Sequence, residues 1–283
     1  MEKRIVSFAG QSIAIDFDDA NAEQLINFLF CDLEKNDPVT PAITLRIRMA
    51  NGGNRMSLYT GSRRLYDGYS LHPLADILVN ETIHQLILEN KWGHMLHAAA
   101  LSFEGKGILI PGQSGSGKST LAAWLTYNGF NYLTDELVFI SNKPYRIYPF
   151  TRPVCLKAPA VSPLIKRIKI DRQKTLGGRT GLMIPHRLLN TDHLAHTPAP
   201  LIILFPNFET GKNTTLTKLS GAQSGLKLMG CHVNARNLTG HGFREVAEFA
   251  RMAKAFSLTY NGFDGLLEAL KPILGMMNHS RAL

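Results

Sequence analysis

Residues 112–119 combine glycines with a lysine and a serine in the pattern G-x-x-x-x-G-K-[ST]. The glycines let backbone N–H groups turn inward around phosphate oxygens, because no Cβ stands in the way. A lysine directly after the last glycine can reach the β- and γ-phosphates, and the hydroxyl beside it can bind Mg²⁺. The pattern therefore predicts a site for a nucleoside triphosphate, ATP with Mg²⁺. The residues predicted to bind it are Gly112, Gln113, Ser114, Gly115, Ser116, Gly117, Lys118, Ser119 and Thr120.

Two adjacent acidic residues, Asp135 and Glu136, follow this loop at a short distance along the chain. Phosphoryl transfer needs a carboxylate for Mg²⁺ and a group that positions or deprotonates the attacking oxygen. Adjacent residues on a strand point to opposite faces, so both can serve one site only if the strand ends or bends there. We predict that both are catalytic, together with Lys118, and that Asp135 and Ser119 bind the metal. The alternative is a solvent-facing acidic turn.

One histidine, His97, precedes the loop on a segment with strand character. A histidine acts in catalysis only when a partner lies within reach, and a lone histidine on a strand is more often structural. Its residue type alone therefore leaves both roles open.

The elements that must position these groups can be predicted from the pattern of apolar residues. Residues 95–103 and 107–110 predict two strands joined by a tight turn, which makes them antiparallel. A helix over residues 118–127 should follow the loop, so that the N-terminal end of the helix dipole faces the phosphates. Residues 131–134 and 137–140 predict strands on either side of the acidic pair.

The rest of the chain predicts an α/β protein with a mixed sheet. Residues 1–90 predict a small N-terminal α+β lobe, and residues 91–283 predict the nucleotide-binding domain. The lobe contains a helix over residues 20–30, a turn at residues 51–54 and a long helix over residues 74–90, which we expect to pack on the central sheet. After residue 144 the chain reads as irregular, with a basic stretch at 166–179. Strands at 201–205 and 214–219 and helices at 220–229, 242–255 and 266–276 complete the prediction.

Composition narrows the classes of protein. The chain has 283 residues, of which 45% are hydrophobic, and a formal charge of +9. That length and composition suffice for a full core. Cys31, Cys155 and Cys231 lie far apart, which favours buried, reduced thiols over a zinc site or disulfides. No apolar run approaches the ~20 residues that span a bilayer, and no signal peptide is visible, so we expect a cytoplasmic protein without a membrane partner.

These motifs together resemble the catalytic domain of HPr kinase/phosphorylase. The resemblance rests on His97 with the three alanines after it, the turn at 104–107, the loop at 112–119 and the run 129–138. It is closer still to HPr kinase-related kinases of bacterial gene clusters, through residues 152–157 and Phe205-Pro206. The resemblance implies a P-loop kinase fold like that of phosphoenolpyruvate carboxykinase, and an ATP-dependent kinase.

The resemblance also assigns residues and partners. Asp135 and Glu136 match the aspartate pair of the family, His97 matches its upstream histidine, and Arg179 matches an arginine of its mobile basic segment. Glu136 replaces an aspartate, and Lys157 stands where the family has an acidic residue, which argues against the reverse reaction and against HPr as the substrate. The implied acceptor is a Ser or Thr hydroxyl of a peptide or protein, with a peptide-binding chaperone and a homo-oligomer as possible partners.

Other functions stay open. Residues 219–223, Leu-Ser-Gly-Ala-Gln, resemble the signature of ABC ATPases, but no apolar strand ending in Asp-Glu follows, and Ser220 is better interpreted as a helix cap. A small-molecule kinase on the same fold and a non-catalytic ATP sensor are the remaining alternatives. A nucleic-acid partner would rest on net charge alone, so none is predicted.

Overall fold

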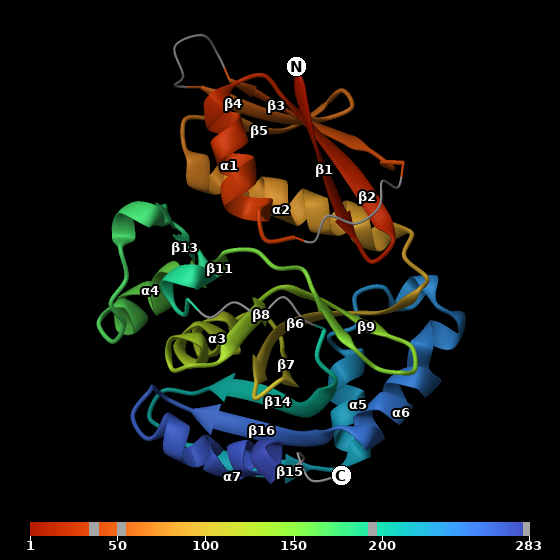
Figure 1. Cartoon of the computed structure of the whole chain (residues 1–283), viewed down its shortest axis with the longest axis vertical. Helices are drawn as coiled ribbons and strands as arrows, with labels where there is room; N and C mark the ends of the chain where they lie inside the picture. The colour runs from red at the N-terminus through yellow and green to blue at the C-terminus, as the bar shows by residue number, and fades with distance from the viewer. Residues whose placement is uncertain (34–39, 50–54, 192–196, 280–283) are drawn as a thin grey trace. The chain divides into compact units, whose positions relative to one another are not determined.

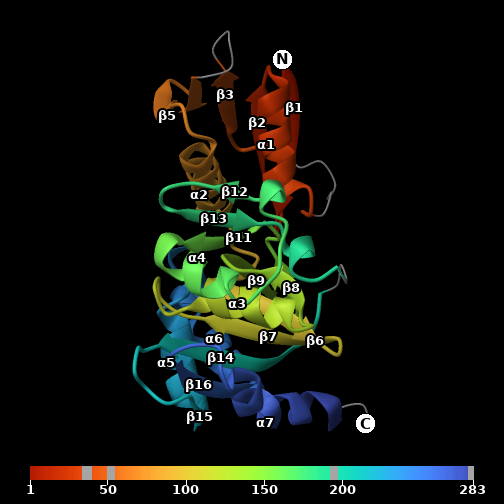
Figure 2. The same cartoon turned by 90° about the vertical axis from the view of Figure 1, so that its left-hand side faces the viewer.

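The computed structural model describes residues 1–33, 40–49, 55–191 and 197–279, which form two compact units of mixed α/β structure (Figures 1 and 2). The first unit comprises Met1–Trp92, Thr151–Pro163 and Asp171–Pro185, and the second comprises Gly93–Phe150, Leu164–Ile170 and His186–Leu283. We predicted a boundary between residues 90 and 91, and the first segment of the first unit ends at Trp92. We assigned Thr151–Pro163 and Asp171–Pro185 to the second domain, whereas they belong to the first unit. The turn predicted at 51–54 lies outside the described residues.

The first unit is built on a sheet with the strand order β1-β2-β3-β4-β5, along which the helices α1 and α2 pack. Its elements are β1 (Glu2–Phe8), β2 (Gln11–Phe17), α1 (Ala20–Phe30), β3 (Thr44–Met49), β4 (Met56–Thr60), β5 (Arg63–Gly68) and α2 (Leu71–Leu88). The Asp19 side chain caps α1 by accepting a hydrogen bond from the Asn21 N–H at 2.7 Å. The long helix α2 packs on β2, β4 and β5, so its predicted place on the central sheet was wrong.

The later segments of the first unit form a small sheet of order β11-β13-β12. It consists of β11 (Val154–Lys157), β12 (Leu176–Gly177) and β13 (Gly181–Ile184), with α4 (Ala158–Ile165) and the 3₁₀ turn η1 (Arg172–Lys174) between the strands. We predicted irregular chain here because of its prolines. Antiparallel pairing of β11 with β13 supplies the long-range hydrogen bonds that the local sequence did not reveal.

The second unit contains the central mixed sheet, with the strand order β10-β9-β6-β7-β14-β16-β15 and with β8 paired to β6. Its strands are β6 (Gly93–Phe103), β7 (Lys106–Pro111), β8 (Asn131–Thr134), β9 (Leu137–Ser141), β10 (Ile147–Pro149), β14 (Pro200–Phe208), β15 (Thr215–Leu219) and β16 (Lys254–Tyr260). Strands β7, β14 and β16 run parallel, whereas β6 is antiparallel to β7, β8 and β9. The predicted hairpin of β6 and β7 is confirmed.

Helices cover both faces of this sheet. They are α3 (Lys118–Tyr127), α5 (Gly221–Met229), α6 (Phe243–Met252) and α7 (Leu266–His279), with short 3₁₀ turns η2 (His186–Leu188), η3 (Ala235–Asn237) and η4 (Thr239–Gly242). Helix α3 contacts β6, β7 and β8, while α5 and α6 pack together over a core cluster on the other face (Figure 1). The helix predicted at 242–255 ends earlier, because residues from Lys254 onward pair in β16, a strand that we missed.

None of the helices in the described residues combines the length and apolar composition needed to cross a bilayer.

Candidate functional site

The predicted phosphate loop joins the end of β7 to the start of α3, as its pattern requires. Gly115 and Gly117 have φ angles of 89° and 94°, in the left-handed region that residues with a Cβ rarely adopt. At Gly117 an added Cβ would also lie 2.1 Å from the hydroxyl oxygen of Tyr260. Glycine is therefore required at this position for both conformation and space.

Residues at the ends of two other strands, β14 and β16, form hydrogen bonds with the loop. The hydroxyl of Tyr260, the last residue of β16, donates to the Gly117 carbonyl at 3.0 Å, and the N–H of Phe208, the last residue of β14, donates to the Ser116 carbonyl at 3.2 Å. Burial raises the pKa of Tyr260, so its hydroxyl remains a donor. Because β7, β14 and β16 are parallel, their carboxyl ends meet at one edge of the sheet, and the loop lies at that edge.

The residues of the loop and of the helix start differ sharply in solvent exposure. Lys118 is buried, and its ammonium donates to the Gln113 carbonyl at 2.9 Å. Ser119 and Thr120 are half-buried on the first turn of α3, whereas Gln113, Ser114 and Gly115 are exposed. The Ser116 hydroxyl is buried and has no hydrogen-bond partner among the described residues. A buried hydroxyl of this kind leaves a donor for a ligand that enters the loop.

The register of β6 brings the acidic pair to the same end of the sheet as the loop. Ala98 pairs with Pro111, the residue before the loop, and its N–H donates to the Glu136 carbonyl at 3.2 Å. With strands spaced by about 4.8 Å, the backbones at Pro111 and Glu136 lie roughly 10 Å apart. Next to Ala98, the His97 Nδ1 lies 3.2 Å from a carboxylate oxygen of Glu136, and both side chains are about one-third exposed.

Alternation along the strands places these side chains on the face that α3 covers. Leu96, Ala98 and Leu133 belong to the core cluster under α5 and α6, so His97 and Tyr132 point the other way. Asp135 is buried and accepts a hydrogen bond from the Tyr132 hydroxyl at 3.0 Å, which holds its carboxylate on the α3 side. The pair lies in the bend between β8 and β9, which meets the condition under which both carboxylates can serve one site.

Sequence reasoning missed two tyrosines that support this region. Tyr132 stacks on His186 with ring centroids 5.3 Å apart while it donates to Asp135, and Tyr260 supports the loop. Each follows from strand pairing between distant segments, so the available signal was only an aromatic residue with a polar tip at a strand end.

Arg179 lies in the first unit, on the exposed turn between β12 and β13. Its predicted role at the nucleotide therefore stays a prediction. In the same basic stretch, Arg167 forms a bidentate ion pair with Asp264 at 2.7 and 2.8 Å, and this contact lowers the pKa of the Asp264 carboxyl. At least this side chain of the basic stretch is engaged within the protein.

The segment that resembles an ABC signature is the start of α5. The Ser220 hydroxyl accepts from the Gln223 N–H at 3.2 Å, and the Gln223 side chain accepts in return from the Ser220 N–H at 2.9 Å. Gly221 and Gly225 face α6, where a Cβ on either would contact that helix. The interpretation of Ser220 as a helix cap is confirmed.

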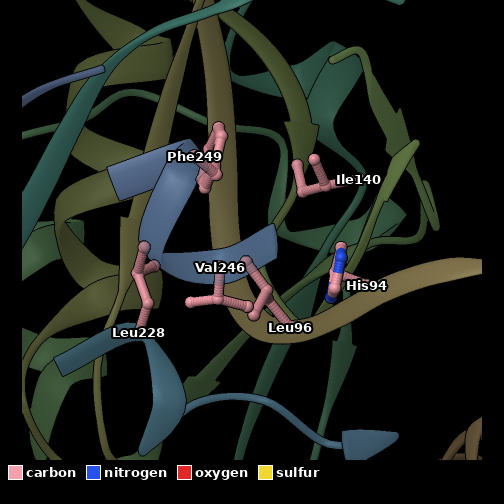
Figure 3. Close-up of a pocket in the computed structure, with 6 residues that line it drawn as sticks. All are labelled: His94, Leu96, Ile140, Leu228, Val246 and Phe249. Atoms are coloured by element: carbon pink, nitrogen blue, oxygen red, sulfur yellow. The ribbon is translucent and has the colours of Figure 1, made fainter. Parts of the chain in front are cut away.

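A small cavity lies on the opposite face of the central sheet from α3. Figure 3 shows its lining of His94, Leu96, Ile140, Leu228, Val246 and Phe249. Its volume is about 10 Å³, room for about one water molecule and far too little for a nucleotide. This cavity is therefore a packing defect of the core and separate from the candidate site.

The cysteines differ in exposure, contrary to the expectation of three buried thiols. Cys31 is exposed and Cys155 is half-buried, so of the three only Cys231 is buried.

Comparisons with known proteins give no family for this chain. No protein-family model matches it, and no curated protein matches its sequence. Among solved structures, that of the HPr(Ser) kinase/phosphatase from Coxiella burnetii matches over 65% of this chain and 98% of its own, with 12% identity and a TM-score of 0.34. A likeness of this degree assigns neither a family nor an activity.

Proposed function

We propose that this chain is an ATP-dependent kinase that transfers the γ-phosphoryl group to a hydroxyl, with a peptide or protein Ser or Thr as the acceptor. The observation that carries the proposal is the set of groups at one edge of the central sheet. These groups are a loop with left-handed glycines, a buried lysine at a helix start, and an acidic pair with an adjacent histidine. The motif resemblance to HPr kinase-related kinases supports a phosphoenolpyruvate carboxykinase-like P-loop fold, with a peptide-binding chaperone and a homo-oligomer as the proposed partners. The proposed location is the cytoplasm.

The loop has the groups that a triphosphate needs. Its backbone N–H groups and the start of α3 offer a partial positive charge to phosphate oxygens. Lys118 can exchange its bond to the Gln113 carbonyl for a phosphate oxygen, a charge-assisted bond that is about twice as strong as a neutral one. The unpartnered Ser116 hydroxyl supplies a further donor.

The oxygen donors on the α3 side fit a magnesium ion. Mg²⁺ in phosphotransferases is typically held by one or two carboxylates together with substrate phosphates, so few protein ligands are needed. Here the half-buried Ser119 hydroxyl and the buried Asp135 carboxylate are the hard oxygen ligands that would hold it. When bound, Mg²⁺ neutralises charge on the phosphate oxygens.

The difference in burial between the two carboxylates suggests a division of roles. Asp135 is buried and oriented by Tyr132, which suits a metal ligand. Glu136 is partly exposed and lies 3.2 Å from His97, so an acceptor hydroxyl from solvent can reach this pair. Glu136 and His97 would orient that hydroxyl and receive its proton.

Calorimetry and phosphate transfer test the proposal. The wild-type chain should bind Mg·ATP, and mass spectrometry should find a phosphate adduct on small peptides encoded next to its gene. Asp135→Asn keeps the shape and the acceptor for Tyr132 but loses the charge, so transfer should fall by about 10²-fold or more while nucleotide still binds. If the chain's cellular function does not depend on phosphate transfer and survives in Asp135→Asn, the protein is an ATP sensor. A lack of ATP and GTP binding would refute the site.

A further inference from the structure

Two segments of the chain form hydrogen bonds along the same edge of β6, one after the other. Residues 98–103 pair with β7, which leaves the sheet at Pro111 to form the phosphate loop. Beyond that point the same edge is covered by residues 231–234, which we call the edge segment. Its first residue, Cys231, accepts a hydrogen bond from the His97 N–H at 2.8 Å, next to the point where β7 departs.

The edge segment is anchored firmly along β6. Its Val233 N–H donates to the Met95 carbonyl at 2.9 Å. The Asn234 side chain is buried, accepts from the Met95 N–H at 2.8 Å and donates to the Gly93 carbonyl at 2.9 Å. These bonds take the place of a strand partner and fix the position of Cys231 at the junction between strand and loop.

The Cys231 side chain is 7% exposed at this junction, where Pro111 of β7 leads into Gly112, the first residue of the phosphate loop. Burial, the largest cause, raises the pKa of the thiol, while the charge of Lys118, the Gly112 N–H and the charge of Lys227 act in the opposite direction. The sulfur is thus a neutral, weak acceptor for the N–H at the first residue of the phosphate loop.

We propose that Cys231 is a positioning residue for the nucleotide: its backbone carbonyl fixes His97, and its side chain supports Gly112 and Lys118 from beneath the loop. The inference rests on the proposed function, because it assigns a role at the same site. We therefore expect separate effects on ATP binding and on the rate of transfer. A change of the side chain should weaken ATP binding, whereas His97, held through the backbone carbonyl, should keep its place and leave kcat nearly unchanged.

Three variants test this separation. Cys231→Val is close to isosteric but cannot accept a hydrogen bond, Cys231→Ala removes the sulfur without adding bulk, and Cys231→Ser retains an acceptor. We expect Kd and KM for Mg·ATP to rise about fivefold in the Val and Ala variants, the equivalent of roughly 1 kcal/mol, with recovery in the Ser variant. Cys31→Val, at an exposed thiol, is the matched control and should bind as the wild type does.

A second measurement needs no variant. In the wild-type chain, Mg·ATP should slow alkylation of Cys231 but leave that of Cys31 unchanged, as followed by mass spectrometry. Failure of the wild-type chain to bind ATP would overturn the proposed function and this inference together. Wild-type binding with an equal Kd in the Val and Ala variants, or with Cys231 alkylation indifferent to ATP, would overturn the inference alone.

Discussion

The two faces of the central sheet differ although the same strands build both. On one face, Leu96 and Ala98 of β6 pack with Phe249 and Ala250 of α6 into a closed apolar core. On the other, His97 of β6 joins the acidic pair and the phosphate loop where the strands end. Strand alternation therefore lets one strand contribute to stability and to a site at once, because successive side chains leave the sheet on opposite sides.

The closed face stabilises the fold, and the open end of the sheet holds features that cost stability. A buried ammonium, glycines at positive φ and an unpartnered buried hydroxyl each disfavour the folded state. Such features persist at functional sites, where they serve binding or catalysis. The comparison predicts that substitutions at the open end change activity, whereas substitutions on the closed face change stability.

The largest effect is expected for Lys118→Ala. Removing the ammonium should lower the rate of phosphate transfer by about 10³-fold, because a positioned charge on the phosphates is lost. The melting temperature should hardly change, since a buried charge is removed together with its hydrogen bond to the Gln113 carbonyl. Lys227→Ala is the matched control, because Lys227 lies over the Phe205 ring at 5.6 Å on the closed face. Wild-type transfer rates in Lys118→Ala would break the comparison.

Phe249→Ala tests the closed face. Phe249 is 3% exposed and packs on Tyr145, with ring centroids 5.3 Å apart, so truncation should lower the free energy of unfolding by about 3–5 kcal/mol. Urea denaturation measures this loss, and Phe243→Ala, at an exposed position of the same helix, should change stability by no more than about 0.5 kcal/mol. Under conditions where Phe249→Ala stays folded, its affinity for ATP should equal that of the wild type. A weaker affinity would show that the faces are coupled.

A pair of glycines separates backbone strain from site geometry. Gly117 and Gly129 have nearly equal φ angles, 94° and 93°, but a Cβ at Gly129 meets nothing within 4 Å. Gly129→Ala should therefore cost about 1–2 kcal/mol from strain alone. Gly117→Ala adds a clash with Tyr260 and should cost roughly 2–4 kcal/mol. Only Gly117→Ala should also weaken ATP binding, and equal binding by both variants would contradict the placement of the site.

Local patterns were sufficient to predict the centre of this site, and long-range pairing explains what they missed. The helix at 118–127 and the strand at 131–134 have their predicted bounds, because glycine, apolar spacing and the turn residues all act within a few positions. Strand β16 was missed because the predicted helix extended to residue 255, into the first two residues of the strand, and the pairing with β14 and β15 is long-range. The contacts of Tyr260 and Cys231 depend on that pairing and on the edge of β6. No short stretch of sequence contains them.

The smallest expected effect is that of acidic pH on stability, and it arises from two histidines on the closed face. The ring nitrogens of His94 and His232 lie 3.4 Å apart, and burial, as the largest cause, lowers the pKa of both, that of His232 to about 4. His94 adds to the shift of His232, whereas Glu245 raises the pKa of His94 and Asn234 that of His232. An unfolded histidine has a pKa near 6.5, so the unfolded chain takes up protons first as the pH falls. The stability from neutral His232 is complete above that pH and is lost as the pH falls from about 6.5 toward 4.

Between pH 6.5 and 5.5 this single histidine should remove about 1 kcal/mol from the free energy of unfolding, as measured by urea denaturation. His232→Gln should lose that part of the pH dependence, and His84→Gln, at an exposed position of α2, should retain it. The ATP affinity of folded wild-type protein should not follow the same titration, because His232 belongs to the closed face. A parallel loss of affinity over this pH range would mean that the edge segment transmits protonation from one face of the sheet to the other, since it joins His232 to Cys231.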